Sequence, residues 1–366
     1  MKIAIFGHKS IPNGSGGVEV VVEELAVRLA AQGHSVTCLN RKGESGEKLR
    51  HYCGVRIKEL PTVRRRGLAA VSSSVFGAIC AAFGDCDVVH IHAEGPAFMC
   101  WLPKLLGKRT VVTVHGLDHQ RAKWGRFASR YIMCGEKNAV RWADEIIVLS
   151  RNVQEYFKKT YGRETVYIPN GMSRRERAEA DEIVTRWGLQ KDGYILFLGR
   201  LVPEKCPELL IKAFANVKTD KKLVIAGGSS DTNDYVNKLH ALAAGDDRIV
   251  FTGFVSGRPK EELFSNACFY VIPSSVEGMP LTLLEAVSYG CCCLTSDIPE
   301  CAEVVGDCAL SFPAGDGAAL TAALQSLCDE PERVESYRRL SEKVLKNGLS
   351  WDEMTEKTLA LYRGYE

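Results

Sequence analysis

The chain has 366 residues, and at about 150 residues per domain this length favours two domains. Hydrophobic residues make up 46% of the chain and charged residues 25%, as in an ordinary globular protein with enough apolar material for two cores. The formal net charge of +2 excludes the overall basic composition typical of nucleic-acid binding, so we expect no nucleic-acid partner.

Short apolar runs alternate with longer amphipathic stretches through the first half of the chain. This alternation predicts a parallel sheet with helices on both faces. The expected strands are 2–6, 35–39, 55–60, 87–92, 109–114, 145–149 and 165–168, and the expected helices are 18–32, 67–83 and 127–142.

The same alternation begins again after the turn sequence Ile168-Pro-Asn-Gly-Met172. The expected strands are 194–198, 223–226, 249–251, 269–272, 292–295 and 309–312, and the expected helices are 208–217, 234–243, 259–266, 318–329 and 351–365. We therefore expect an α/β protein with two facing, doubly wound Rossmann-like domains, 1–172 and 173–348, and a C-terminal helix in 349–366. The carboxyl ends of the strands, where ligands collect, would lie on a shared cleft.

Cysteine spacing and apolar runs indicate the compartment. The 14 cysteines include no Cys-x-x-Cys pair. Cysteines 291–293 are adjacent in a strand-like run, where neighbouring side chains point to opposite faces and are poorly placed to bind the same metal ion. We expect free thiols in a reducing cytosol. The N-terminal apolar run is too short for a signal peptide, and the stretch 67–83 falls short of the ~20 apolar residues that a membrane span needs. The expected location is cytoplasmic, with the inner face of the cell membrane left open.

The most informative motif is Glu277-Gly-Met-Pro-Leu-Thr-Leu-Leu-Glu285. Pro280 suits the first position of a helix that ends at Gly290, so Glu277 would precede the helix and Glu285 would lie one to two turns inside it. Two carboxylates and free backbone N–H groups at one helix N-terminus could accept hydroxyls and hold phosphate. Alone, the pair is also typical of an ordinary solvated helix.

A second motif, Gly199-Arg200-Leu-Val-Pro-Glu-Lys205, follows an expected strand. Arginine offers a planar fork for phosphate oxygens and lysine a compact point charge, although two cations on a surface loop are common. With both motifs, the chain resembles the retaining glycosyltransferases of the GT-B fold, specifically family 4 (group 1), which use sugar nucleotides. The resemblance extends over nearly the whole chain and is strongest over 193–300. It implies that the C-terminal helix in 349–366 crosses back and packs on the first domain.

The resemblance implies roles in the second domain. Arg200 and Lys205 match the cations that hold the donor diphosphate. Glu277 matches the glutamate that contacts the donor sugar, and Glu285 the one that binds the nucleotide ribose. Further residues expected to line the donor, including the loop that packs on the base, are Gly199, Val255, Gly278, Met279, Pro280, Leu281 and Thr282.

In the first domain, Gly16 and Gly17 lie in a glycine-rich turn after the first expected strand. The turn does not fit the dinucleotide pattern Gly-x-Gly-x-x-Gly, and alone it predicts a tight turn without a ligand. The resemblance implies that it approaches the donor phosphates and the acceptor.

Histidines end two expected strands of the first domain. His115 precedes a glycine, and a histidine in such a position is about as often a packing residue as a functional one. The resemblance implies that His115 lies close to the reacting carbon, where it would form a hydrogen bond with the donor sugar. Asp118 could bind the acceptor hydroxyl. We expect His90 and His92 to be structural, with acceptor contact as the lesser alternative.

Breaking the bond to the diphosphate builds negative charge that a metal or fixed cations must stabilise. No Asp-x-Asp motif occupies a plausible position, so we expect Arg200, Lys205 and helix amides to act without a metal and without a cofactor. The donor would be a nucleotide sugar, with a UDP-sugar favoured and dTDP- and GDP-sugars left open. The resemblance implies retention of configuration, and we expect the acceptor to attack from the face that the departing phosphate leaves.

Basic residues flank the apolar stretch 67–83 and follow His115. They are Arg64, Arg65, Arg66, Arg121, Lys123, Arg126 and Arg130, with Trp124 among them. Basic plus apolar surface suits an anionic membrane, but it also fits a solvated loop and a core helix. Because the chain is similar to bacterial polysaccharide-assembly members of the family, we expect a saccharide or lipid-linked saccharide acceptor and peripheral membrane contact.

Three other functions compete with this one. A GT-B phosphorylase or epimerase is a rival, but phosphorylases of this fold are much longer and have a pyridoxal-linked lysine without a counterpart here. A Rossmann-type binding or dehydrogenase module would need Gly-x-Gly-x-x-Gly and an acidic residue about 20 positions later, which the chain lacks. A catalytically inactive glycosyltransferase-like partner protein stays open, although every expected charged position is filled.

Overall fold

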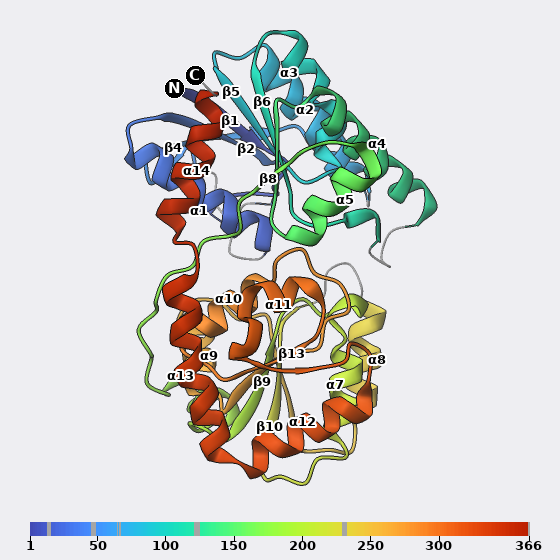
Figure 1. The fold of residues 1–366 in the computed structure, drawn as a ribbon, viewed down its shortest axis with the longest axis vertical. Coiled ribbons are helices and arrows are strands. Elements are labelled where there is room, and N and C mark those ends of the chain that lie inside the picture. The colour runs from blue at the N-terminus through green and yellow to red at the C-terminus, as the bar shows by residue number, and fades with distance from the viewer. Residues whose placement is uncertain are drawn as a thin grey trace. The chain divides into compact units, whose positions relative to one another are not determined.

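The computed structural model of the chain consists of two compact units (Figure 1). Unit 1 comprises Met1–Gly171 and Leu349–Glu366, and unit 2 comprises Met172–Gly348. The residues that the structure describes are 1–12, 16–44, 49–63, 65, 67–120, 125–228 and 233–364. Outside them lie Arg64, Arg66, Arg121, Lys123 and Trp124, which the sequence assigned to a basic surface, and the end of the last expected helix at Tyr365.

Unit 1 is built on an eight-stranded sheet in the order β3-β4-β2-β1-β5-β6-β7-β8, in which only the β3–β4 pair is antiparallel. The winding direction changes between β1 and β5, so the loops after these two strands diverge at a topological switch point. The strands are β1 (Lys2–Phe6), β2 (Ser35–Arg41), β3 (His51–Tyr52), β4 (Val55–Leu60), β5 (Val88–His92), β6 (Arg109–Val114), β7 (Glu145–Val148) and β8 (Val166–Tyr167).

Helices complete unit 1. They are α1 (Gly17–Ala31), α2 (Leu68–Ala82), α3 (Trp101–Leu105), α4 (Arg126–Trp142), α5 (Arg151–Tyr161) and α14 (Trp351–Arg363), with the short 3-10 helices η1 (Pro96–Met99) and η2 (Asp118–Gln120). Among the described residues, no helix combines the length and the apolar character that crossing a membrane would require.

The C-terminal helix α14 belongs to unit 1, as the family resemblance implies (Figure 1). It begins with a capping box, in which Ser350 Oγ accepts a bond from Glu353 N at 3.1 Å and Glu353 Oε2 accepts one from Ser350 N at 2.8 Å. Arg28 of α1 donates to Asp352 at 2.7 Å, and Tyr362 is buried against β5. The helix is therefore an integral part of the unit 1 core.

Unit 2 has a six-stranded, fully parallel sheet in the order β11-β10-β9-β12-β13-β14. Its switch point lies between β9 and β12. The strands are β9 (Tyr194–Leu198), β10 (Lys222–Ala226), β11 (Ile249–Gly253), β12 (Phe269–Ile272), β13 (Cys293–Ser296) and β14 (Leu310–Phe312). Strands of a parallel sheet covered on both faces consist of apolar residues, and β9 and β12 are buried throughout.

The helices of unit 2 cover both faces of this sheet (Figure 1). They are α6 (Glu182–Trp187), α7 (Pro207–Phe214), α8 (Asn233–Ala243), α9 (Gly257–Asn266), α10 (Leu281–Ser288), α11 (Pro299–Val305), α12 (Gly317–Asp329) and α13 (Pro331–Asn347), with the 3-10 helices η3 (Pro203–Lys205) and η4 (Gly306–Cys308). All 14 cysteines are free thiols, and the three adjacent ones, 291–293, are buried in unit 2.

The structure corrects the sequence-based elements in detail. The expected strands and helices are present, and β1, β4, β6, β9 and β12 have the expected bounds whereas the other elements have shifted ends. The elements β3, α3, α5, α6, α11 and α13 were not predicted. Pro280 is not the first helical residue: its ψ of 97° is extended, which makes it the N-cap of α10. The reason is that Pro280 O already accepts the bonds from Leu283 N and Leu284 N, so the helical backbone begins one residue later.

Candidate functional site

The predicted donor residues of unit 2 follow the two strands at its switch point. Arg200 lies two residues after the end of β9, and Glu277 lies in the loop between β12 and α10. Lys205, the last residue of η3, donates from Nζ to Glu277 Oε1 at 2.5 Å. The side chains of Lys205 and Glu277 are only 13% and 7% exposed. The structure thus brings together two of the residues that the sequence assigned to diphosphate and sugar.

Backbone contacts hold the two loops together. Ser275 N, in the loop after β12, donates to Glu204 O of η3 at 2.9 Å. This bond ties the loop after β9 to the loop after β12, one residue from Lys205. The Lys205–Glu277 pair is therefore fixed by the fold as well as by its own attraction.

The N-terminus of α10 lies beside this pair. Its first amides, those of Leu281 and Thr282, have no intrahelical partner because the first turn of any helix leaves them unpaired, and the helix dipole favours an anion there. Thr282 Oγ1 accepts a bond from Tyr270 Oη at 2.8 Å. Gly278 and Pro280 are buried, whereas Met279 is partly buried and packs on the core.

Glu285 lies one turn further along α10 and has a partner that sequence reasoning missed. Lys260 of α9 donates from Nζ to Glu285 Oε1 at 2.6 Å, and both side chains are about one-quarter to one-third exposed, at 26% and 32%. No local pattern around Lys260 indicates this pairing, because α9 and α10 meet only in the folded sheet.

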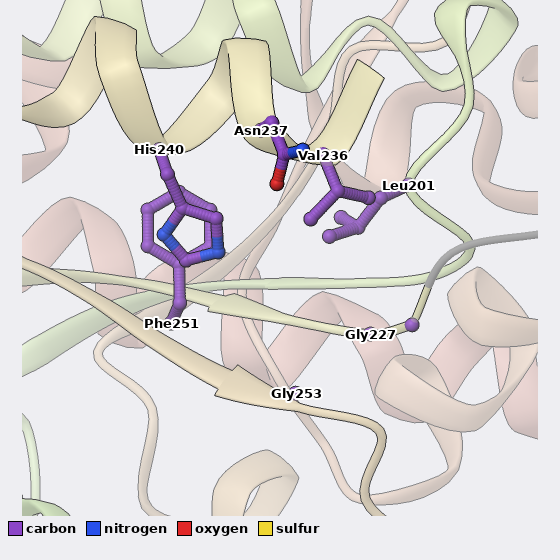
Figure 2. A pocket seen from close by; sticks show the side chains of 8 residues that line it. Leu201, Gly227, Val236, Asn237, His240, Phe251 and Gly253 are labelled. Carbon is purple, nitrogen blue, oxygen red and sulfur yellow. The ribbon is translucent and has the colours of Figure 1, made fainter. Parts of the chain in front are cut away.

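A pocket of about 370 Å³ opens at the carboxyl ends of β10 and β11 (Figure 2). It is lined by Leu201, Gly227, Gly228, Val236, Asn237, His240, Phe251 and Gly253. The rings of His240 and Phe251 contact each other with centroids 4.0 Å apart and an angle of 34° between the ring planes. None of the predicted site residues is among these lining residues. Two of them are near the lining in sequence: Arg200 directly precedes Leu201, and the half-buried Val255 lies two residues after Gly253.

Close backbone packing shapes the edge of this pocket. A Cβ at Gly227 would lie 1.8 Å from the carbonyl oxygen of Gly199, and Gly227 has a φ of +153°. Only glycine fits this approach of the loops after β9 and β10. The predicted residue Gly199 therefore contributes its backbone to a tight contact.

In unit 1, the glycine turn packs against an acidic side chain. Gly16 is the N-cap of α1, and Gly17 is its exposed first residue. A Cβ at Gly16 would lie 2.1 Å from Glu19 Oε2, while Glu19 Oε1 accepts a bond from Lys9 N at 2.9 Å. A side chain at Gly16 would therefore require the Glu19 carboxylate to move.

His115 follows β6 and is hydrogen-bonded to a neighbouring histidine. The distance from His115 Nε2 to His92 Nδ1 is 2.9 Å. His90 is bonded on both ring nitrogens, to Tyr362 Oη at 2.6 Å and to Thr113 Oγ1 at 2.7 Å. Burial lowers the pKa of His90 to about 3 and that of His92 well below its usual value. Both are neutral, His90 is structural as expected, and His92 orients His115.

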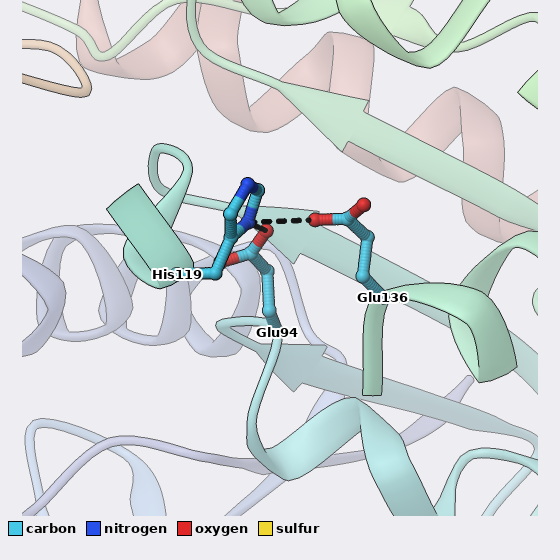
Figure 3. A group of neighbouring side chains, drawn as sticks. All are labelled: Glu94, His119 and Glu136. Atoms are coloured by element: carbon cyan, nitrogen blue, oxygen red, sulfur yellow. Dashed lines mark ion pairs between the residues drawn. The ribbon is translucent and has the colours of Figure 1, made fainter. Parts of the chain in front are cut away.

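Asp118 begins η2 and leads to a buried group that the sequence did not predict (Figure 3). Asp118 N donates to Glu94 Oε2 at 2.7 Å. Glu94 follows β5 and is enclosed with Glu136 of α4 and His119 of η2. Burial, together with the facing Glu136 carboxyl, raises the pKa of Glu94 well above its usual value. The sequence signal for this cluster is limited to the position of Glu94, which closely follows an expected strand.

Comparisons with known proteins agree with this fold and these motifs. The family model for "Glycosyl transferases group 1" matches residues 180–346, and the model for "Glycosyltransferase Family 4" matches residues 15–175. The D-inositol 3-phosphate glycosyltransferase of Thermomonospora curvata is 26% identical over 96% of this chain and 91% of its own length. An uncharacterized glycosyltransferase of Bacillus subtilis, YqgM, is 31% identical, but the match spans only 56% of each protein.

Solved structures share the fold at low identity. Sucrose-phosphate synthase from Thermosynechococcus elongatus superposes with a TM-score of 0.85 at 21% identity, covering 99% of this chain and 98% of that one. Anabaena Alr3699/HepE in complex with UDP-glucose has a TM-score of 0.81 at 16% identity, with both chains fully covered. The two doubly wound units are of the GT-B type, and the two family models match the N-terminal and C-terminal halves of the chain. The chain therefore belongs to family 4, group 1, of the glycosyltransferases.

Proposed function

We propose that the protein transfers a hexosyl group from a UDP-sugar to a hydroxyl of a saccharide or lipid-linked saccharide, with retention of anomeric configuration. The observation that supports this most is the buried Lys205–Glu277 pair at the switch point of unit 2, beside the N-terminus of α10. A switch point is where open α/β sheets bind ligands. The complex of Alr3699/HepE with UDP-glucose supports the choice of donor.

The pair can change partners when a donor enters. A phosphate oxygen would replace the Glu277 carboxylate as the partner of Lys205, and Glu277 would then accept bonds from sugar hydroxyls. Because both side chains are largely buried, neither group could lose its partner without a large desolvation cost. A ligand that carries both an anion and hydroxyls satisfies them together.

The leaving diphosphate would be stabilised by this chain's own groups. Arg200 and Lys205 supply two positive charges, and the free amides of α10 supply oriented dipoles. We propose that these groups hold the diphosphate without a metal, and that its departing oxygen takes the proton of the attacking hydroxyl. His115 and Asp118 of unit 1 are the proposed contacts to the donor sugar and the acceptor hydroxyl.

Calorimetric titration with UDP, GDP, ADP and dTDP, after treatment with EDTA, tests the donor site. We expect the protein to bind UDP, Arg200→Ala to lose most of that affinity, and Arg174→Ala to keep it. Arg174 is a suitable control because it is a cation of the same unit with a 77% exposed side chain. No binding of any nucleotide by the folded protein would favour the inactive partner protein instead. Product analysis by NMR, which reads the anomeric configuration, tests retention.

An exposed apolar face on α2 supports peripheral membrane contact, and hence a lipid-linked acceptor. Leu68, Phe76 and Ile79 are 49%, 40% and 41% exposed, and Phe83 at the helix end is 75% exposed. Their spacing places them on one side of the helix, while Ala78 on the other side is buried. With the exposed Arg65 just before the helix, this face fits an anionic lipid surface.

A further inference from the structure

Three side chains of unit 1 direct ligand atoms that lack hydrogen bonds at one another. They are Glu94, His119 and Glu136, and one atom from each lies within 4.8 Å of the other two (Figure 3). His119 Nδ1 is 3.3 Å from Glu136 Oε2 and 3.9 Å from Glu94 Oε1. Both glutamate side chains are 0% exposed. Among the residues that the structure describes, none of these three atoms has a hydrogen-bond partner, and a protonated His119 would form ion pairs with both carboxylates.

The other oxygen of each carboxylate is fixed by a hydrogen bond. Glu94 Oε2 accepts from Asp118 N at 2.7 Å. Glu136 Oε1 accepts from Tyr156 Oη at 2.9 Å and also from Tyr161 Oη. Carboxylates that bind metals are held in this way, with one oxygen bonded to the protein and one directed at the ion. The unpaired oxygens are therefore aimed by the fold.

The backbone also forces the two carboxylates together. A Cβ at Gly135 would lie 1.9 Å from the carbonyl oxygen of Glu94, so α4 approaches the loop after β5 as closely as glycine allows. This contact sets Glu136 beside Glu94. Two buried carboxylates that face each other are costly unless a cation or protons neutralise them.

We propose that Glu94, His119 and Glu136 bind a divalent transition-metal ion of the zinc type. An imidazole nitrogen with two carboxylate oxygens is a ligand set that zinc accepts, at bonds of about 2.0–2.2 Å. Tetrahedral geometry at such bond lengths separates the ligand atoms by roughly 3.3–3.5 Å. The distance of 3.3 Å from His119 Nδ1 to Glu136 Oε2 falls in this range, and the distance of 3.9 Å to Glu94 Oε1 would have to shorten when an ion binds. The mixed nitrogen and oxygen set favours zinc or cobalt over magnesium and calcium, which prefer oxygen alone.

The ion would join three segments of unit 1: the loop after β5, η2 and α4. Because Glu94 also holds the amide of Asp118, the ion would fix the turn that carries this residue. Its role is structural, and it is separate from the metal-free donor site proposed for unit 2. The two proposals can therefore fail independently.

Spectroscopic titration of the full chain with Co²⁺, after removal of metals and chelator, tests the site. We expect one equivalent to bind with visible d–d bands and without a thiolate charge-transfer band, and Zn²⁺ to displace it. His119→Gln and Glu136→Gln should each weaken binding at least tenfold. His51→Gln, which removes an exposed histidine of the same unit, should have no effect.

Controls make every result decisive. Thermal unfolding followed by circular dichroism shows whether each variant is folded. If Glu136→Gln does not fold, His119→Gln, at a partly exposed position, tests the proposal by itself. Cys134→Ser removes an exposed thiol on α4, and loss of Co²⁺ binding in this variant would assign the ion to cysteine. Three results would overturn the proposal: loss of Co²⁺ binding in Cys134→Ser, no Co²⁺ binding by the folded protein, or undiminished binding in both His119→Gln and Glu136→Gln. Shared protons would then neutralise the two carboxylates.

Discussion

Lys205 Nζ of η3 lies 2.5 Å from Glu277 Oε1 in the loop before α10, and the two side chains are 13% and 7% exposed. The contact joins the loops that follow β9 and β12, the strands on either side of the switch point in unit 2. A buried ion pair contributes little net stability by itself. Its position at a ligand-binding edge of the sheet is better explained by function.

We predict that Lys205→Ala and Glu277→Ala each abolish sugar transfer while the protein stays folded. Loss of the Lys205 charge beside the developing negative charge costs about 3 kcal/mol, a factor of 10² or more in rate. Glu277→Ala removes the acceptor for the sugar hydroxyls and leaves the buried Lys205 without its partner. Transfer assays with UDP-sugars, alongside circular dichroism, measure both effects. Lys212→Ala is the control, because it breaks a pair with Glu208 in which Lys212 is 57% exposed, and such surface pairs contribute little. Full activity in both site variants would refute the mechanism.

Glu285 should act on the ribose and not on the phosphates. Glu285→Ala is expected to weaken UDP binding about tenfold, or about 1.4 kcal/mol, and to remove the preference for UDP over its 2′,3′-dideoxy analogue. Lys260→Ala should cause a smaller loss, because it frees the Glu285 carboxylate without deleting it. Calorimetry with both nucleotides measures these effects. An unchanged preference for ribose in Glu285→Ala would show that the carboxylate has another role.

The sequence predicted the strands of both sheets well because parallel strands buried on two faces are short apolar runs, as in Tyr194–Leu198 and Phe269–Ile272. The family resemblance of their two motifs also implied that Lys205 and Glu277 lie close together, and their side chains are in contact. It did not predict α13, whose sequence is mostly polar. Nor did it find Lys260 or the Glu94–His119–Glu136 cluster, because those partners come from segments that only the sheet topology brings together.

The exposed face of α2 predicts binding to anionic vesicles. Phe76→Ser and Phe83→Ser together remove two large apolar side chains that are 40% and 75% exposed, so co-sedimentation with vesicles containing phosphatidylglycerol should fall severalfold. Raising the salt concentration should weaken the wild type as well, since basic residues near the surface contribute through screened attraction. Phe254→Ser, at a 58% exposed site in unit 2, is the control. Equal sedimentation of all variants would rule out this face.

Buried neutral histidines predict acid lability. In the folded state, burial lowers the pKa of His8 to about 4 and that of His90 to about 3. The unfolded chain, with ordinary values near 6.5, binds more protons below that pH, so stability falls as pH falls from about 6.5 towards these values. Each histidine contributes a slope of about 1.4 kcal/mol per pH unit.

His90→Gln tests this linkage. Tyr362, Thr113 and the ring of His92 contact His90, and the charge of His115 also lowers its pKa. The variant should lose stability at pH 7 because its hydrogen bonds are rebuilt imperfectly, but its stability should depend less steeply on pH between 6.5 and 4. Urea unfolding at a series of pH values measures the slope. An unchanged slope would mean that His90 does not remain neutral in the folded protein.

The start of α14 is packed too closely to tolerate a side chain at Gly171. A Cβ there would lie 2.5 Å from both the backbone nitrogen and the Cα of Trp351, and Trp351 is buried in unit 1. Because backbone atoms cannot give way as a flexible side chain can, Gly171→Ala should destabilise unit 1 by about 1–3 kcal/mol or more. The strain acts on the first turn of α14, so hydrogen exchange should increase over Trp351–Arg363 before it does so in the strands. Gly125→Ala, with no atom within 4 Å of its Cβ, should leave exchange in α14 unchanged. Equal exchange in α14 for the two variants would show that the contact between Gly171 and Trp351 does not hold the C-terminal helix in place.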